Sequence, residues 1–112
     1  MAKARITYHV PSTWAWNPRL VSESFVRVER ERTLNALANL NQDESNLDDD
    51  CFRIEQEIRG QWATANANVM RAFQERLYGI KKERARLNGV GKKLNHALKQ
   101  IHEIGAQRGW KF

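Results

Sequence analysis

Hydrophobic residues recur with helical spacing through the middle of the chain. Ten apolar positions are separated by three or four residues each: Leu47, Cys51, Ile54, Ile58, Trp62, Ala65, Val69, Phe73, Leu77 and Ile80. Their mean spacing is about 3.67 residues, close to the period of a straight α-helix and above the 3.5 of a left-handed coiled coil. The spacing predicts a long helix over residues 43–88. Gly60 and Gly79 are the candidate positions for a bend or a break, because glycine costs about 1 kcal/mol relative to alanine inside a helix.

A second helical stripe predicts a C-terminal helix over residues 90–105. It consists of Val90, Leu94, Ala97, Leu98, Ile101 and Ile104. Gly105 follows where glycine often ends a helix, and the sequence Asn-Gly-Val-Gly at 88–91 is typical of a turn. We therefore expect residues 43–88 and 90–105 to form an antiparallel helical hairpin that bends at residues 88–91.

Residues 20–42 show a helical pattern of their own. Val21, Phe25 and Val28 are spaced by four and three residues, and Ser22 or Ser24 can cap the start of a helix. The run VRVERER at 26–32 also has an alternating pattern, so a strand is the alternative. We predict a third helix over 20–42 that closes the open face of the hairpin.

The N-terminal residues 1–19 lack a helical pattern. Residues 6–10 alternate between apolar and polar side chains, as in a short extended stretch. Trp14 and Trp16 are two residues apart and would point the same way on an extended chain. We predict an extended aromatic arm whose two indoles fill a groove on the helices. The alternative is a stacking platform for bases or a contact site for a protein partner, with Trp110 in the tail as a third candidate.

Together these patterns predict a mainly α protein in which residues 1–112 form a single domain. A chain of 112 residues and 13.1 kDa has room for one hydrophobic core. Its single cysteine excludes an internal disulfide and a zinc site built on several thiolates.

Positive charge is concentrated late in the sequence. Residues 1–70 hold eight basic and ten acidic side chains, whereas residues 71–112 hold eleven basic and three acidic ones, a net charge of +8. Such an asymmetry is typical of a surface that faces a polyanion. The alternative is a solvated helical surface balanced by the acidic residues 43–50. The three aspartates at 48–50 are also explained by the first turn of a helix, where the helix dipole favours negative charge.

The predicted bend would bring the cations of two helices together. On the second helix, Lys92, His96 and Lys99 share one face at spacings of four and three residues, opposite the apolar stripe. A sugar–phosphate backbone is the commonest partner for such a surface. The candidate nucleic-acid-binding residues are Lys81, Lys82, Arg84, Arg86, Lys92, Lys93, His96 and Lys99.

No pattern in the sequence predicts catalysis. Cys51 lies on the apolar stripe, where a buried and inert thiol is expected. His96 and His102 are six residues apart and so lie on different faces of a helix, whereas metal sites on helices use spacings of three or four. We therefore expect a protein that is not an enzyme and that has neither a metal site nor a cofactor.

Residues 86–103, RLNGVGKKLNHALKQIHE, resemble the Leu-x-x-x-Gly-x-x-Leu-Asn stretch of accessory proteins in plasmid mobilisation. The matching positions are Leu87, Gly91, Leu94 and Asn95, with His96 where that family tends to have Gln. The resemblance covers less than a fifth of the chain, and residues 1–45 lack the ribbon–helix–helix pattern. It implies a helical DNA-binding partner of a relaxase at a transfer origin.

We therefore expect a small non-catalytic nucleic-acid-binding accessory protein, with DNA favoured over RNA, that uses the basic C-terminal hairpin. The alternative is an adaptor or inhibitor of phage or mobile-element type that docks on a larger protein complex through the aromatic arm and helix faces. A homo-oligomer that buries the long apolar stripe is a further possibility. No apolar run approaches the roughly 20 residues that cross a bilayer, and residues 1–10 lack a secretion signal, so we expect a cytoplasmic protein without a membrane partner.

Overall fold

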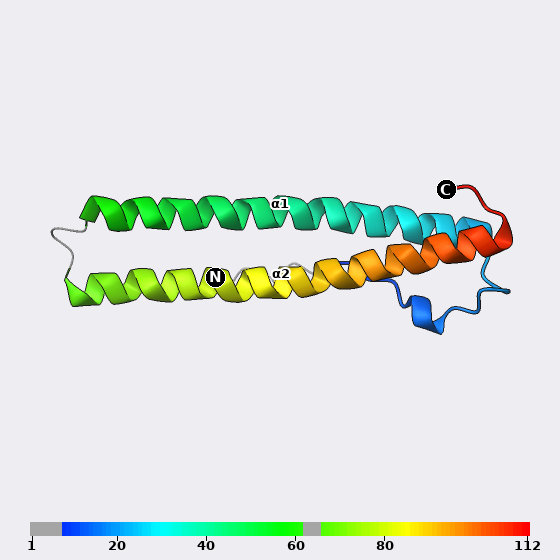
Figure 1. The fold of residues 1–112 in the computed structure, drawn as a ribbon, viewed down its shortest axis with the longest axis horizontal. Helices are drawn as coiled ribbons and strands as arrows, with labels where there is room; N and C mark the ends of the chain where they lie inside the picture. Colours follow the sequence, from blue (N-terminus) through cyan, green and yellow to red (C-terminus); the bar gives the residue numbers. More distant parts are fainter. Residues whose placement is uncertain (1–7, 62–65) are drawn as a thin grey trace. The chain divides into compact units, whose positions relative to one another are not determined.

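The computed structural model describes residues 8–61 and 66–112, and two long α-helices dominate it (Figure 1). Helix α1 spans Glu23–Gln61 and helix α2 spans Ala67–Arg108, while a short 3-10 helix, η1, occupies Thr13–Ala15. The described ranges contain no strand. The mainly α class and the pairing of two long helices, which the hydrophobic spacing predicted, are confirmed.

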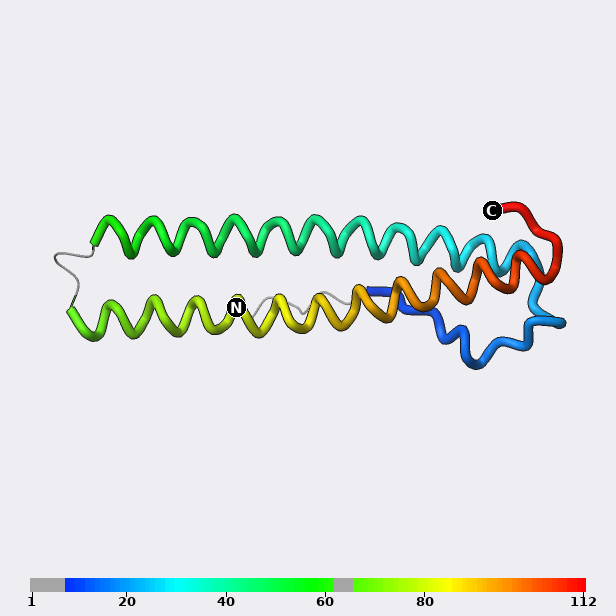
Figure 2. The backbone as a smooth tube through the Cα atoms, in the orientation of Figure 1, coloured from blue at the N-terminus to red at the C-terminus, as the bar shows by residue number. Residues whose placement is uncertain are grey.

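Residues 1–40 and 89–112 form one compact unit, called unit 1 below, and residues 41–88 form a second, called unit 2. In unit 1, Arg30 Nε donates to His102 Nε2 at 3.3 Å, and Leu40 lies beside Gly91. As the residue number on α1 rises from 30 to 40, the number of the facing residue on α2 therefore falls from 102 to 91. The two helical segments of unit 1 are antiparallel, as the backbone trace shows (Figure 2).

The two helical segments of unit 2 are also antiparallel. Arg76 Nη1 lies 3.2 Å from Glu57 Oε2, and Arg84 forms an ion pair with Asp48. Residues 48 and 84 are therefore level with each other, as are residues 57 and 76. The buried apolar side chains that the structure describes in unit 2 are Ile54, Phe73 and Leu87.

Facing apolar stripes form the core of unit 1. The stripe predicted at residues 90–104 supplies most of the α2 contribution. The buried apolar side chains are Val26, Ala36 and Leu40 from α1, and Leu94, Ala97, Ile101 and Ile104 from α2. Because a pair of helices leaves both sides of its seam open, such a core needs cover from other parts of the chain.

Residues 8–16 supply cover on one side of unit 1. The buried Thr13 donates its hydroxyl to Oε1 of Gln100 on α2. His9 Nε2 lies 2.5 Å from Oε2 of Glu29, a buried carboxylate that also pairs with Arg32 at 3.3 Å. These contacts join the N-terminal segment to both helices, and they satisfy a carboxylate whose burial would otherwise be costly.

The C-terminal tail covers the end of unit 1. Gly109 has a φ of 73° and stands just after the helix, and the Trp110 amide donates to the Gly105 carbonyl at 2.8 Å. This is the Schellman motif, which needs a residue with a left-handed backbone. The tail then places the Phe112 ring against Gly105, where an added Cβ would lie 2.5 Å from a ring carbon.

The predicted third helix over 20–42, separate from a helix at 43–88, is wrong. The chain from Glu23 to Gln61 is one helix, so no helix ends at residue 42 or begins at residue 43. Neither glycine nor proline occurs between residues 23 and 59, so no residue there interrupts the helix. The prediction of Ser22 as a cap is confirmed, because the Phe25 amide donates to Ser22 Oγ at 3.2 Å.

The predicted bend at residues 88–91, between helices over 43–88 and 90–105, is also wrong. Helix α2 continues through Gly89 and Gly91, because burial of Leu87 and Leu94 on either side outweighs about 1 kcal/mol per glycine. The break instead follows Gly60, one residue before α1 ends. Gly79 lies inside α2, and Gly105 does not end the helix.

Asn66 caps the second helix, since its side-chain oxygen accepts the Val69 amide at 3.0 Å. The apolar stripe at 47–80 is therefore divided between two antiparallel helices. Trp62 and Ala65, which the stripe included, lie outside the described residues. The aspartates at 48–50 lie in the middle of α1, so the helix dipole does not explain them.

The extended aromatic arm predicted over 1–19 is not supported. Residues 1–7, including Ile6, lie outside the described residues, and residues 13–15 form the 3-10 turn η1. The indoles do not share a groove: Trp16 packs edge-on against Phe25 with ring centroids 5.2 Å apart, whereas Trp14 is 84% exposed.

Candidate nucleic-acid interface

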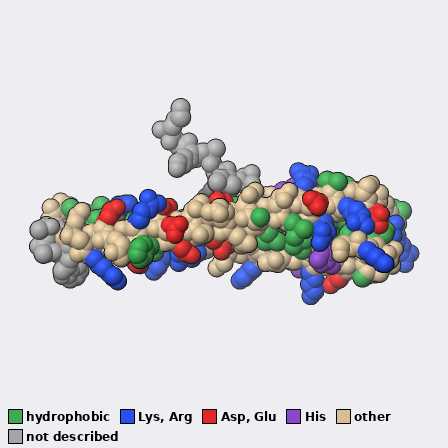
Figure 3. All heavy atoms as spheres, turned by 90° about the horizontal axis from the view of Figure 1, so that it is seen from above, with side chains coloured by type: hydrophobic (Ala, Val, Ile, Leu, Met, Phe, Trp, Pro, Cys, Tyr) green, Lys and Arg blue, Asp and Glu red, His purple; other side chains and the backbone are tan. Residues whose placement is uncertain are grey.

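The fold redistributes the charge that the sequence places near its end. By sequence, unit 1 holds eleven Lys and Arg against four Asp and Glu, a net charge of +7. Unit 2 holds eight against nine, a net charge of −1. Two of the eleven, Lys3 and Arg5, lie outside the described residues. The positive excess of the chain is therefore collected in unit 1, and Figure 3 shows Lys, Arg and His side chains on the face of unit 1 that it displays.

The eight cationic residues predicted as one site are divided between the units. No bend gathers them, because all eight lie along α2. Three of the four in unit 2 have an acidic or aromatic partner. Arg84 pairs with Asp48, and Arg86 Nε donates to Glu83 at 3.0 Å. Lys82 stands 4.9 Å from the centre of the Tyr78 ring, and Lys81 is exposed.

The four predicted residues in unit 1 are more available. Lys92, Lys93, His96 and Lys99 are all exposed. Within the described ranges, no carboxylate lies within ion-pair distance of any of the three lysines. Lys92, His96 and Lys99 follow one face of α2, as their spacing predicted. This face can therefore bind an anion without first breaking a contact inside the chain.

Trp14 lies beside this cationic face. A cavity of about 200 Å³ has walls from residues 10–14 and from α2, where its lining includes Lys93, His96 and Gln100. The hydrogen bond between Thr13 and Gln100 fixes the residue before Trp14 on α2, 87 positions away in sequence. An exposed indole thus stands next to a lysine and a histidine, which is the combination that stacks a base while a cation meets the phosphate.

The other two tryptophans predicted for partner binding have contacts inside unit 1. Trp16 is half-buried against Phe25. Trp110 is half-buried as well, with the Arg108 guanidinium 4.6 Å from its ring centre. Of the three tryptophans predicted for partner binding, Trp14 is therefore the one whose ring is mostly exposed.

Sequence reasoning missed a second group of cations around the C-terminal tail. The guanidinium groups of Arg27 and Arg30 lie 5.2 Å and 5.7 Å from the centre of the Phe112 ring. Arg27 also donates to the Lys111 carbonyl, and Arg108 donates to the Pro18 carbonyl, both at 2.8–2.9 Å. These contacts join residues more than 80 positions apart, so no local pattern could have revealed them. They add positive charge to unit 1.

The part of the chain that the structure describes contains no group of three or more His, Cys, Asp and Glu placed to hold a metal ion. Neither described helix is long and apolar enough to cross a membrane. Comparison with protein-family models, curated proteins and solved structures gave no significant match. The similarity of residues 86–103 to mobilisation proteins therefore stays a prediction.

Proposed function

We propose that this protein binds single-stranded nucleic acid, without catalysing a reaction on it, through unit 1. One observation carries the proposal: the exposed Trp14 ring lies beside Lys93 and His96 in the unit that holds the positive excess of the chain. Lys92 and Lys99 extend the cationic face along α2. Exposed bases can stack on the indole while the lysines neutralise the phosphates.

A single strand suits this arrangement better than a duplex. Stacking on Trp14 needs the face of a base, and in a duplex that face is covered by its neighbours. Base–aromatic stacking is worth about 1–3 kcal/mol per base and depends little on sequence. DNA is the form that the similarity of residues 86–103 to mobilisation proteins favours. We therefore expect binding with little sequence preference, as in an accessory factor that holds an opened strand.

Replacing three lysines together tests the proposal. The variant with Lys92, Lys93 and Lys99 all changed to Gln should bind a labelled single-stranded oligonucleotide at least about tenfold more weakly, because three phosphate contacts are lost. Fluorescence anisotropy measures this affinity for DNA, for RNA of the same sequence and for a duplex.

The matched control removes the same charge from unit 2. Changing Arg59, Arg71 and Lys82 to Gln takes three exposed cations from residues outside the proposed interface. This control should keep its affinity within about twofold, since non-contacting charges act only through screened long-range attraction. Equal losses in the two triple variants would contradict the proposal, because net charge and not the α2 face would then govern binding.

A second candidate function is docking on a protein partner. Trp14 and Leu20 are 84% and 80% exposed on the same short segment, and large exposed apolar residues are typical of protein contact sites. The change Trp14→Ala distinguishes the two functions. If the protein is an adaptor, the unchanged protein should not bind an oligonucleotide, and Trp14→Ala should abolish binding of the protein partner. If the proposed function is right, Trp14→Ala should weaken binding to single-stranded nucleic acid.

A further inference from the structure

Unit 2 has an open side that the rest of the described chain does not cover. In unit 1, residues 8–16 and the tail close over the helix pair, and seven apolar side chains are buried. Among the described residues of unit 2, three apolar side chains reach that burial, and Leu47, Cys51, Leu77 and Ile80 stay partly exposed. Since two helices alone cannot enclose a core, the described residues of unit 2 leave part of their apolar stripe open.

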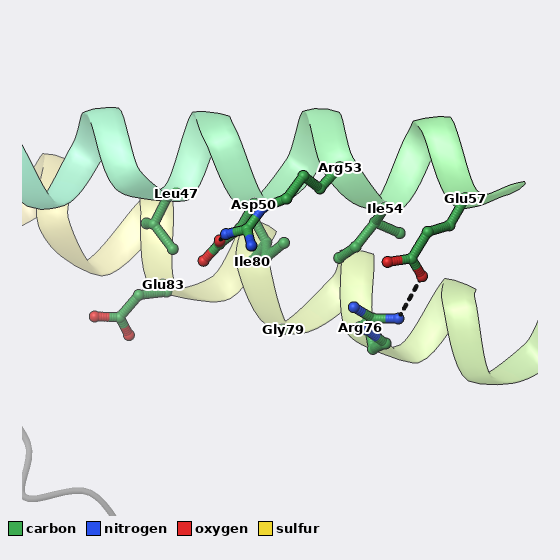
Figure 4. A pocket seen from close by; sticks show the side chains of 9 residues that line it. All are labelled: Leu47, Asp50, Arg53, Ile54, Glu57, Arg76, Gly79, Ile80 and Glu83. Carbon is green, nitrogen blue, oxygen red and sulfur yellow. Dashed lines mark hydrogen bonds and ion pairs between the residues drawn. The ribbon is translucent and has the colours of Figure 1, made fainter.

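The two sides of the unit 2 helix pair differ in chemistry. Figure 4 shows the first, a cavity of about 410 Å³ whose charged lining is paired within the chain: Asp50 with Arg53, and Glu57 with Arg76. The second side, called the Tyr78 groove below, has a volume of about 490 Å³. Its lining consists of Cys51, Glu55, Gln74, Leu77, Tyr78, Ile80, Lys81 and Arg84.

The Tyr78 groove has large apolar rims. Tyr78 on α2 is 61% exposed, and so is Phe52 on α1, which lies next to Cys51 and three residues before Glu55. Tyr78 lines the groove, and Phe52 neighbours its lining residue Cys51 in sequence; exposed aromatic residues at such a groove are characteristic of a protein contact surface. They do not yet say what occupies it.

The charges along the groove identify the occupant. On α1 the groove is lined by Glu55, whereas on α2 it is lined by Lys81 and Arg84. Arg84 already pairs with Asp48 of α1 in the same chain, while within the described ranges neither Glu55 nor Lys81 has an ion pair. The α1 edge therefore offers the Glu55 carboxylate and the α2 edge offers the Lys81 ammonium. A partner that places a basic helix over α1 and an acidic helix over α2 is complementary to both edges, and a second copy of this chain has that arrangement.

We propose that two copies of this chain pair through their Tyr78 grooves to form an antiparallel four-helix bundle. The twofold axis runs parallel to the helices of unit 2, because only this choice sets the acidic α1 edge of each copy against the basic α2 edge of the other. An axis across the helices would oppose α1 to α1, with like charges facing.

The levels of the side chains agree with this axis. Rotation about an axis parallel to the helices keeps each residue at its own height. Because residue 48 is level with 84 and residue 57 with 76, Phe52 is level with about residue 80. Phe52 of one copy therefore meets the region of Tyr78 in the other, and Glu55 comes within reach of Lys81. Four neighbouring helices then run antiparallel, which is the usual arrangement of a short-loop bundle.

Charge exchange between two variants tests this pairing without nucleic acid present. Sedimentation velocity of the full chain should give a species of twice the 13.1 kDa chain mass. The dimer would contain two contacts between Glu55 of one copy and Lys81 of the other. Either variant, Glu55→Lys or Lys81→Glu, places like charges in both contacts, so each should raise the dimer dissociation constant at least about tenfold. An equal mixture of the two variants should restore the dimer, because each contact then joins opposite charges.

Two control variants carry the same charge changes away from the groove. Arg71→Glu and Glu75→Lys are exposed positions of α2 that line neither cavity, and both should remain dimeric. Circular dichroism verifies that all four variants keep their helices. The proposal is overturned if the unchanged protein stays at 13.1 kDa from micromolar to millimolar concentration. It is equally overturned if a dimer forms but ignores both charge changes, or if the mixture fails to restore it.

Discussion

The affinity of the protein for single-stranded DNA should fall by about 50-fold when the salt concentration rises from 50 to 200 mM. This fall corresponds to four phosphate contacts, which the three lysines of the α2 face and one arginine of unit 1 would make. Each contact with a single strand adds about −0.7 to the slope of log affinity against log salt, so four give a slope of about −2.8. Anisotropy titrations at five salt concentrations measure this slope.

The size of this effect depends on the cations being free before DNA binds. Lys92, Lys93 and Lys99 have no ion pair within the described ranges, so their phosphate contacts would displace counterions and not carboxylates. An affinity that changes by less than about threefold over the same range would mean that fewer than two phosphates are neutralised. Such a result would contradict an electrostatic interface on unit 1.

Truncation of Leu94 should lower the free energy of unfolding by about 2–5 kcal/mol. Leu94 is fully buried between the helices of unit 1, beneath the face that carries Lys92 and Lys93. Leu94→Ala removes the buried contacts and leaves a cavity that a close-packed core closes only in part. Urea denaturation followed by circular dichroism measures the change.

The chain offers a matched control for this substitution. Leu20 is 80% exposed, so Leu20→Ala removes the same atoms from a site where they contact mainly water. Its effect should stay within about 0.5 kcal/mol. Similar losses for the two substitutions would show that Leu94 is not in a packed core and that the pairing of α1 with α2 in unit 1 is wrong.

Hydrophobic spacing was sufficient to predict a mainly helical chain, but neither the number of helices nor the position of the bend between them. The stripe from Leu94 to Ile104 and the cap at Ser22 were found because each depends on neighbours within one or two turns. The bend was misplaced because Gly89 and Gly91 were taken as a stop. Their cost is local and small, whereas the packing of Leu87 and Leu94 that outweighs it is tertiary. Asn66, a good capping residue, was the local feature that could have located the start of α2.

The candidate site shows the same division between local and long-range information. The shared face of Lys92, His96 and Lys99 follows from helical spacing, so the sequence was enough to find it. The position of Trp14 beside that face does not follow from helical spacing, because it depends on the contact of Thr13 with Gln100 across 87 residues. The sequence placed the positive excess in residues 71–112, and not in unit 1, for a similar reason. The acidic segment at 43–57 pairs with the first half of the basic α2 helix and cancels its charge in unit 2.

Photo-crosslinking to an oligonucleotide that carries 5-iodouracil tests the central claim most directly, because the halogenated base couples to an aromatic ring on which it stacks. After digestion, mass spectrometry identifies the modified residue. We predict that the crosslink maps to Trp14 and that the variant lacking Lys92, Lys93 and Lys99 gives much less of it. A crosslink to Phe52 or Tyr78 of unit 2, or the same yield from Trp14→Ala as from the unchanged protein, would contradict the account.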